Sequence, residues 1–228
     1  MCSFVPQSSK RGMLGLKTRN VRPSVAGPLF WRVLHWSTIV APNSRATAAL
    51  WVHVVDAMGC PACRTHFAKV MSDRYVTTDT RIGLTLGVQL HGDVNRQLSR
   101  VAFPAGSLTE QAEVLQRRHC AGLASLCPRE VASLLLMIAM GADLQGANPR
   151  REAGTAMFVQ AMTKLVCKDE TNTQAWRQLH ANACRLNHTL GGHKRALFEH
   201  VMLLFSDVPG VDVQKIMDDL SKCAFAQQ

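Results

Sequence analysis

Two cysteines separated by two residues, Cys60 and Cys63, are the part of the sequence best suited to chemistry. They stand in the stretch GCPACRTHF, where Pro61 suits the first turn of a helix. A cysteine at a helix start lies near unpaired backbone amides and the positive end of the helix dipole, which stabilise a thiolate. The following Arg64 adds positive potential. The pattern therefore favours thiol–disulfide exchange and leaves the electron acceptor open.

Zinc binding is the alternative for the same residues. Cys60, Cys63 and His66 form a C-x2-C-x2-H spacing, and a closed zinc site would need a further ligand such as His53 or His91. The sequence has no second paired motif of the kind that structural zinc sites usually show. We therefore expect no metal here, and we expect His53, like His180 and His200, to be a structural or surface residue.

Two further pairs of residues could present a flat ring and polar groups to a cofactor. Trp31 and His35 are four residues apart, as are His91 and Asn95, so each pair lies on one face of a helix. A thioredoxin-like fold would need strands around the cysteine motif, and the sequence predicts none there. The electron acceptor must then come from elsewhere, and a bound flavin is the best candidate.

Four motifs in order carry a resemblance to a known family. G-P-x-x-W-x-x-L-H at Gly27–His35, C-x-x-C at Cys60–Cys63, a following Phe67 and H-x-x-V-N at His91–Asn95 resemble the Erv/ALR family of FAD-dependent sulfhydryl oxidases. The match covers about residues 27–100. It implies a four-helix bundle that binds FAD, with the redox-active cysteines at the flavin ring.

The resemblance also implies roles for individual residues. Thiol-containing protein substrates would pass electrons through Cys60 and Cys63 to FAD and then to oxygen, giving hydrogen peroxide. Cys63 would lie beside the flavin, and Cys60 would exchange with the substrate. The residues that the resemblance places at the cofactor are Gly27, Trp31, His35, Phe67, His91, Val94, Asn95 and Arg100.

The sequence departs from the family pattern in two places. Gly92 stands where the family has the first asparagine of H-N-x-V-N, which puts one hydrogen bond to the cofactor in doubt. The family's structural C-x16-C does not follow this motif. Cys167 and Cys184 have that spacing far downstream, which weakly indicates a disulfide between them.

Enzymes of this family usually relay electrons through a second, mobile cysteine pair, and the sequence has no other C-x-x-C. The shuttle candidates are Cys2, alone in the basic tail, and Cys120 with Cys127. Seven residues on one helix would separate the last two by about 10 Å, so they could pair only if the helix breaks before Pro128. Substrate thiols could also reach Cys60 directly.

The elements that must position these residues are all predicted to be helices. Apolar residues recur at helical spacing over 27–42, with Pro28 at the start, over 44–58, from the cysteine pair onward, and over roughly 80–100. Good helix formers are plentiful, while β-branched and aromatic residues are few. We therefore expect an all-α protein whose first bundle has short connections.

The second half carries helix signals too. Ser107–Glu110 has the form of a capping box, Cys127-Pro128 starts an apolar helix that ends near Gly141, and Asn148-Pro149 starts one that runs to Cys167. WRVLH at Trp31–His35 recurs as WRQLH at Trp176–His180, and ALWVHV recurs later as ALFEHV. An internal duplication without the cysteine pair is a fair hypothesis.

These observations divide the chain into three parts. We expect a basic flexible tail over 1–26, an FAD-binding sulfhydryl oxidase bundle over 27–104 and a helical domain over 105–228. Family members are commonly homodimers, and some, including proteins of large DNA viruses, carry a degenerate copy in the partner's place. The third part is therefore expected to be such a copy or an unrelated docking domain.

The composition bears on which classes of protein and which binding partners we expect. Apolar residues make up 47% of the chain and charged residues 18%, so most of the chain should fold. The net charge is +10, and the expected tail is itself basic. We expect no specific nucleic-acid binding from this tail. The longest apolar run, VASLLLMIAMGA, is too short to span a membrane, and no secretory signal is recognisable. The resemblance favours a virion or an infected cell, with the mitochondrial intermembrane space as the alternative.

Overall fold

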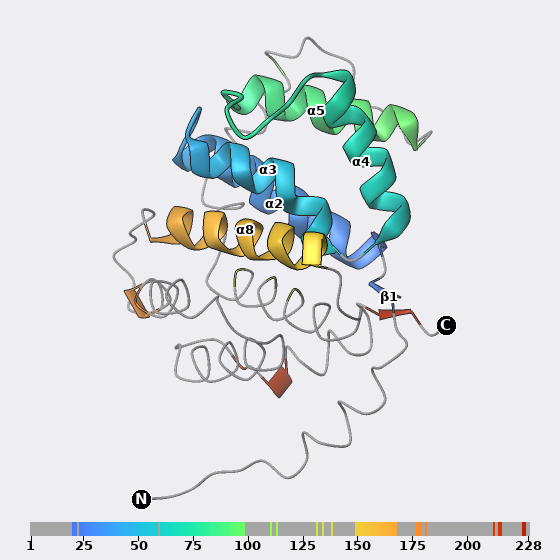
Figure 1. The fold of residues 1–228 in the computed structure, drawn as a ribbon. Helices are drawn as coiled ribbons and strands as arrows, with labels where there is room; N and C mark the ends of the chain where they lie inside the picture. Colours follow the sequence, from blue (N-terminus) through green and yellow to red (C-terminus); the bar gives the residue numbers. More distant parts are fainter. Residues whose placement is uncertain are drawn as a thin grey trace, which may run out of the picture.

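The computed structural model describes residues 20–21, 23–58, 60–98 and 149–167 as continuous segments. It also describes positions 110, 113, 131, 134, 138, 177–178, 181, 212, 214–215 and 225–226. Helices make up most of this part (Figure 1), which confirms the prediction of a helical protein. The one departure within it is a two-residue strand, β1 (Asn20–Val21), paired antiparallel with β2 (Phe225–Ala226).

The first helix, α2, spans Pro23–Val40 and begins five residues earlier than the expected start at Pro28. Pro23 occupies the first helical position, where the missing N–H of proline costs nothing, and Pro28 lies inside the helix. The expected end was nearly right. The chain leaves the helix before Pro42, and Asn43 adopts a left-handed conformation with φ 59°.

The second helix, α3, spans Arg45–Met58 as the apolar pattern predicted. Ser44 caps it, because its Oγ accepts a hydrogen bond from the backbone N–H of Thr47 at 3.0 Å. The Thr47 hydroxyl in turn donates to the carbonyl of Ala41 at 2.7 Å. These bonds hold α3 at a fixed angle to the end of α2.

The next two helices are α4 (Pro61–Asp73) and α5 (Leu84–Gln97). Helix α4 begins at the cysteine pair, as predicted, while α5 starts later than expected because the chain stays non-helical through Gly83. The Nε of Arg74, just past the end of α4, lies 2.8 Å from the carboxylate of Asp93 on α5. This carboxylate also binds Arg96, so the two helices are joined by a charged cluster.

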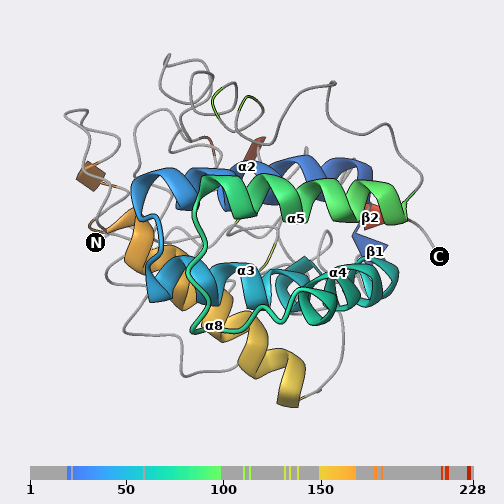
Figure 2. The ribbon, with the colours of Figure 1, turned by 90° about the horizontal axis from the view of Figure 1, so that it is seen from above.

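Helix α8 (Pro149–Val166) belongs to the second half of the sequence but packs against α3. Figures 1 and 2 show α2 and α3 between α5 on one side and α8 on the other. Thr155 donates a hydrogen bond to the backbone carbonyl of Asp56 at 3.1 Å. A Cβ on Gly154 would clash with the side chain of Asp56, so a larger residue there would require that carboxylate to move.

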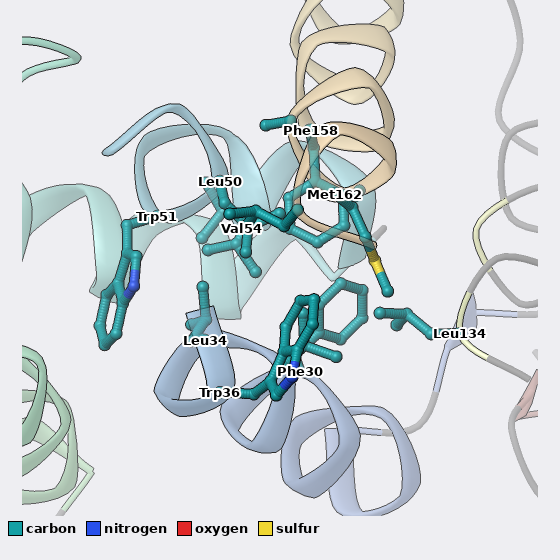
Figure 3. Packing of buried hydrophobic residues seen from close by; sticks show 14 of the residues in the cluster. Phe30, Leu34, Trp36, Leu50, Trp51, Val54, Leu134, Phe158 and Met162 are labelled. Atoms are coloured by element: carbon teal, nitrogen blue, oxygen red, sulfur yellow. The ribbon is translucent and has the colours of Figure 1, made fainter. Parts of the chain in front are cut away.

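One hydrophobic core runs through the described part. Phe30 of α2 and Phe158 of α8 have ring centroids 5.7 Å apart, and Leu50 and Val54 of α3 pack between these helices (Figure 3). Leu134 is buried in the same core. Burial of each large side chain contributes about 1.5–3 kcal/mol relative to exposure. The core therefore joins residues on both sides of the expected boundary at position 104.

Candidate functional site

A disulfide joins the two cysteines of the C-x-x-C motif. Cys60 is the N-cap of α4, with extended backbone angles, and Pro61 follows at the first helical position. The two Cα atoms are 5.3 Å apart, a normal separation for a disulfide. The sequence prediction for the local structure is thus confirmed: the cysteine motif lies at a helix start.

The disulfide is set in an asymmetric environment. Cys60 is 8% exposed, and its Sγ accepts a hydrogen bond from the backbone N–H of Cys63 at 3.2 Å. Cys63 is half-buried, one turn before Phe67 on α4. Four residues of an α-helix rise about 6 Å, so Cys63 and Phe67 lie on one face of α4.

Phe67, one turn after Cys63, belongs to a cluster of rings that come from four helices. Its ring centroid lies 5.9 Å from that of Trp31 on α2 and 6.5 Å from that of Trp51 on α3. Trp31 stacks on His91 of α5 with a centroid separation of 3.7 Å and an interplanar angle of 14°. Together with His35, these residues form what we call the ring cluster: Trp31, His35, Trp51, Phe67 and His91.

Two histidines of the ring cluster are hydrogen-bonded to each other. Nε2 of His35 on α2 lies 3.0 Å from Nδ1 of His91 on α5, so one nitrogen carries the proton and the other accepts it. Burial lowers the pKa of His91 from 6.5 to about 4, because desolvation penalises the charged imidazolium. At neutral pH His91 is therefore an uncharged ring that can stack and share a hydrogen bond.

Three more of the residues expected at the cofactor lie on α2 and α5, namely Gly27, Val94 and Asn95. Asn95 is half-buried and four residues from His91, on the same face of α5, whereas Val94 is 7% exposed and belongs to the core. Gly27 lies one turn before Trp31 on α2, and Gly92 follows His91. A Cβ built on either glycine meets no heavy atom of the described residues within 4 Å, so space is open at both positions.

Trp51 was not among the residues expected at the site. Its indole Nε1 donates to the hydroxyl of Ser37 at 3.3 Å, and a Cβ at Gly87 would come within 3.0 Å of its ring. It is fully buried, in contact with rings of α2 and α4. The signal available in the sequence was a large aromatic residue next to the apolar stripe of α3, which does not by itself distinguish a site from a core.

The two cysteines considered as zinc ligands are bonded to each other in the structure. No group of three or more His, Cys, Asp or Glu side chains in the described part of the chain is placed to hold a metal ion. The disulfide between Cys60 and Cys63 removes both thiolates that a zinc site would use. His53 instead lies with Nδ1 3.8 Å from the carboxylate of Asp56 on α3.

Several expected residues fall outside the described part. These are Arg100 and the shuttle candidates Cys2, Cys120 and Cys127, together with the repeat residues Trp176 and His180. Cys167, at the end of α8, is disulfide-bonded. Because Cys60 and Cys63 bond to each other, its partner lies outside the described residues, and the expected pairing with Cys184 stays a prediction.

Among the described residues, no helix is both long and apolar enough to cross a bilayer. Comparison of the chain with models of protein families, with curated proteins and with solved structures finds no match. The geometry of the disulfide and the ring cluster is therefore what supports an assignment of function.

Proposed function

We propose that this protein is an FAD-dependent thiol oxidase that forms disulfides in protein substrates. One observation carries the proposal: the Cys60–Cys63 disulfide begins a helix whose next turn enters the ring cluster. A dithiol substrate and a planar electron acceptor could thus meet the same cysteine pair. The order of the motifs in the sequence, which resembles the Erv/ALR family, supports the same reading.

The residues present fit a flavin. Trp31 and Phe67 offer flat apolar faces, and His35, His91 and Asn95 offer ring or amide groups for hydrogen bonds. Gly27 lies one turn before Trp31 and Gly92 directly follows His91, and a Cβ at either glycine meets no heavy atom of the described residues within 4 Å. These are the residues that would hold FAD, which when bound supplies a two-electron acceptor that oxygen can reoxidise.

The cysteine pair performs the thiol chemistry. Two substrate thiols lose two electrons and two protons and become a disulfide, while the Cys60–Cys63 disulfide gains them and opens to two thiols. The start of α4 stabilises the thiolate formed on opening, through the backbone N–H of Cys63 and the helix dipole. The buried, uncharged imidazole of His91 keeps the acceptor side of the site free of a fixed positive charge.

An absorbance spectrum of the purified protein, before and after dithiothreitol, tests the proposal. Flavin bands that bleach with the dithiol and recover in air are the expected result, with formation of hydrogen peroxide on recovery. A colourless protein that does not take up added FAD would exclude it. Metal analysis of that colourless protein would then separate a zinc-binding module from an inactive helical scaffold.

The resemblance also bears on the rest of the chain. Residues 105–228 are proposed to be a degenerate copy of the bundle that lies in the place of a dimer partner. The packing of α8 on α3 and α2 supports a close association between the two halves. Size-exclusion chromatography with light scattering would detect a monomer if this copy replaces a partner, and a dimer if it does not.

A further inference from the structure

A guanidinium at the end of α4 binds one flank of α5 at two successive turns. The Nε of Arg74 lies 2.8 Å from the carboxylate of Asp93. Its two terminal nitrogens face the side-chain amide of Gln89 at 2.6 and 3.0 Å, and the atom that they face is assigned as the amide oxygen because both nitrogens are donors. Gln89 and Asp93 are four residues apart and so share a face of α5. We call Arg74, Gln89 and Asp93 the clamp.

The two charged residues of the clamp are held in place by their own surroundings. Arg74 is the C-cap of α4. Tyr75 then adopts a left-handed conformation with φ 53°, and its N–H and that of Val76 bind carbonyls of the last turn of α4 at 3.0 and 2.8 Å. The Asp93 side chain is 14% exposed and also binds Arg96. Because both charges are fixed and partly shielded from water, their attraction should exceed that of an exposed ion pair.

The clamp lies on the side of α5 opposite the ring cluster. Residues two apart on an α-helix are about 200° apart around its axis, so His91 points away from the flank that carries Gln89 and Asp93. On its own flank, His91 stacks on Trp31 with ring centroids 3.7 Å apart and shares a hydrogen bond with His35 at 3.0 Å. Contacts on both flanks therefore limit the rotation of α5 about its axis.

The clamp also lies on the face of α4 that carries the candidate site. Arg74 stands three turns after Cys63, with Phe67 between them on the same face. The rise from Phe67 to Arg74 is about 10 Å, so a group bound among the rings would leave the contacts of the clamp in place. One face of α4 thus carries a cysteine of the disulfide, a ring of the cluster and the residue that binds α5.

We propose that Arg74 is a positioning residue of the candidate site. Through Gln89 and Asp93 it fixes the rotation of α5, and this rotation places the ring of His91 on Trp31. The role rests on the proposed function, in which the ring cluster lies at the electron acceptor. Without the guanidinium, α5 can turn about its axis, so the ring of His91 loses part of its stack and comes into contact with water.

Replacement of Arg74 by methionine tests the proposal, because methionine removes the guanidinium and keeps an apolar stem. Proton NMR follows the titration of His91 in the full-length protein, and the loss of its signal in His91→Asn assigns it. We expect the midpoint of this titration to rise by about one pH unit relative to the wild type, since contact with water lowers the cost of charging the ring. Under the proposed function, the same variant should bind FAD about tenfold more weakly, the effect of one misplaced hydrogen bond.

Lys69→Met is the matched control. The Lys69 ammonium pairs with Asp73 at 2.8 Å on the exposed surface of α4, and exposed pairs contribute little to stability. This variant loses the same charge from the same helix, so it should leave the His91 titration and the FAD affinity unchanged. If Arg74→Met does not fold, Gln89→Leu takes its place, because it keeps the ion pair of the clamp and should shift the midpoint in the same direction by a smaller amount.

An unchanged midpoint or an unchanged FAD affinity in the folded variant, or an equal shift in Lys69→Met, would overturn the inference. The titration requires no flavin, so it separates this inference from the proposed function. A protein that never binds FAD but shows the shift in Arg74→Met would refute the oxidase proposal alone. A flavin-containing, active protein whose His91 titration is the same with and without Arg74 would refute the positioning role alone.

Discussion

Cys60 and His91 show how local surroundings select a charge state on each side of the candidate site. The amide of Cys63 and the start of α4 favour a negative sulfur, while burial of His91 disfavours a positive ring. At neutral pH, the ring of His91 that stacks on Trp31 is therefore uncharged. Substitutions at three positions and a pH series test the roles proposed for residues of the site.

Under the proposed function, replacement of Cys63 by serine should abolish thiol oxidase turnover and leave bound FAD in place. The disulfide cannot form without this sulfur, whereas the ring cluster does not depend on it. The measurement is oxygen consumption with dithiothreitol, alongside the flavin absorbance of the purified variant. Thr65→Ala is the matched control, since the Thr65 side chain is exposed and, among the residues that the structure describes, bonds only the carbonyl of Pro61. An active Cys63→Ser protein would exclude the mechanism.

Under the proposed function, replacement of Gly92 by asparagine should tighten FAD binding. A side chain there meets open space among the described residues, and an amide that reaches the cofactor adds about 1 kcal/mol, or roughly fivefold in Kd. Gly92→Ala is the control, because it gains helix propensity of up to about 1 kcal/mol without a hydrogen-bonding group. Titration of the apoprotein with FAD measures both. Equal affinities for the two variants would show that position 92 does not reach the cofactor.

The lowered pKa of His91 should make stability fall in mild acid. The unfolded chain takes up a proton near pH 6.5, while the folded chain resists it until about pH 4, so stability is full above 6.5 and is lost as pH falls toward 4. The loss attributable to His91 is up to about 3 kcal/mol. Urea unfolding across this range measures it in the wild type and in His91→Asn. Parallel pH profiles for the two proteins would contradict the assignment.

Helix boundaries at the site follow from local signals, and the sequence therefore predicted most of them. Cys60 and Pro61 mark the start of α4, and Ser44 caps α3, since capping depends on neighbours in the chain. The predicted start of α2 at Pro28 was wrong, because Pro23 provides an equally good start one and a half turns earlier. The sequence predicted that Trp31 lies on one face of its helix with His35, and His91 on one face of its helix with Asn95. It could not predict the stack of Trp31 on His91, because that contact depends on how α2 packs on α5.

The packing of α8 on α3 is the contact that sequence periodicity could not predict. Gly154 lies at this contact, and a Cβ there would clash with the side chain of Asp56. Gly154→Ala should therefore lower the free energy of unfolding by about 1–3 kcal/mol despite its better helix propensity, since the Asp56 carboxylate must move away from His53. Thermal or urea unfolding tests this.

Gly92→Ala again serves as the control for Gly154→Ala. Both glycines lie inside helices, but position 92 faces open space, so alanine there should stabilise the protein. The two substitutions are expected to differ in sign. Stabilisation by both would show that α8 does not approach α3 as closely as described.

The core shared by the two halves of the chain sets the size of the folding unit. Phe30, Leu50 and Val54 come from the first half, while Phe158 and Met162 come from the second, and all are buried together (Figure 3). Removal of the second group would expose the faces of α2 and α3 that lie opposite α5. A chain with one continuous core is expected to unfold in one cooperative transition.

A fragment ending at residue 104 should therefore fail to fold as a stable monomer, although it contains all the residues of the ring cluster. The exposed side chains of Phe30, Leu50 and Val54 would cost about 1.5–3 kcal/mol each, a large share of the 5–15 kcal/mol by which domains are usually stable. Self-association is the expected way to cover them. Light scattering and circular dichroism of the fragment, beside the full chain, measure the outcome. A monomeric fragment with cooperative unfolding and bound flavin would show that residues 105–228 are dispensable for the fold of the site, and that α8 only covers an already stable bundle.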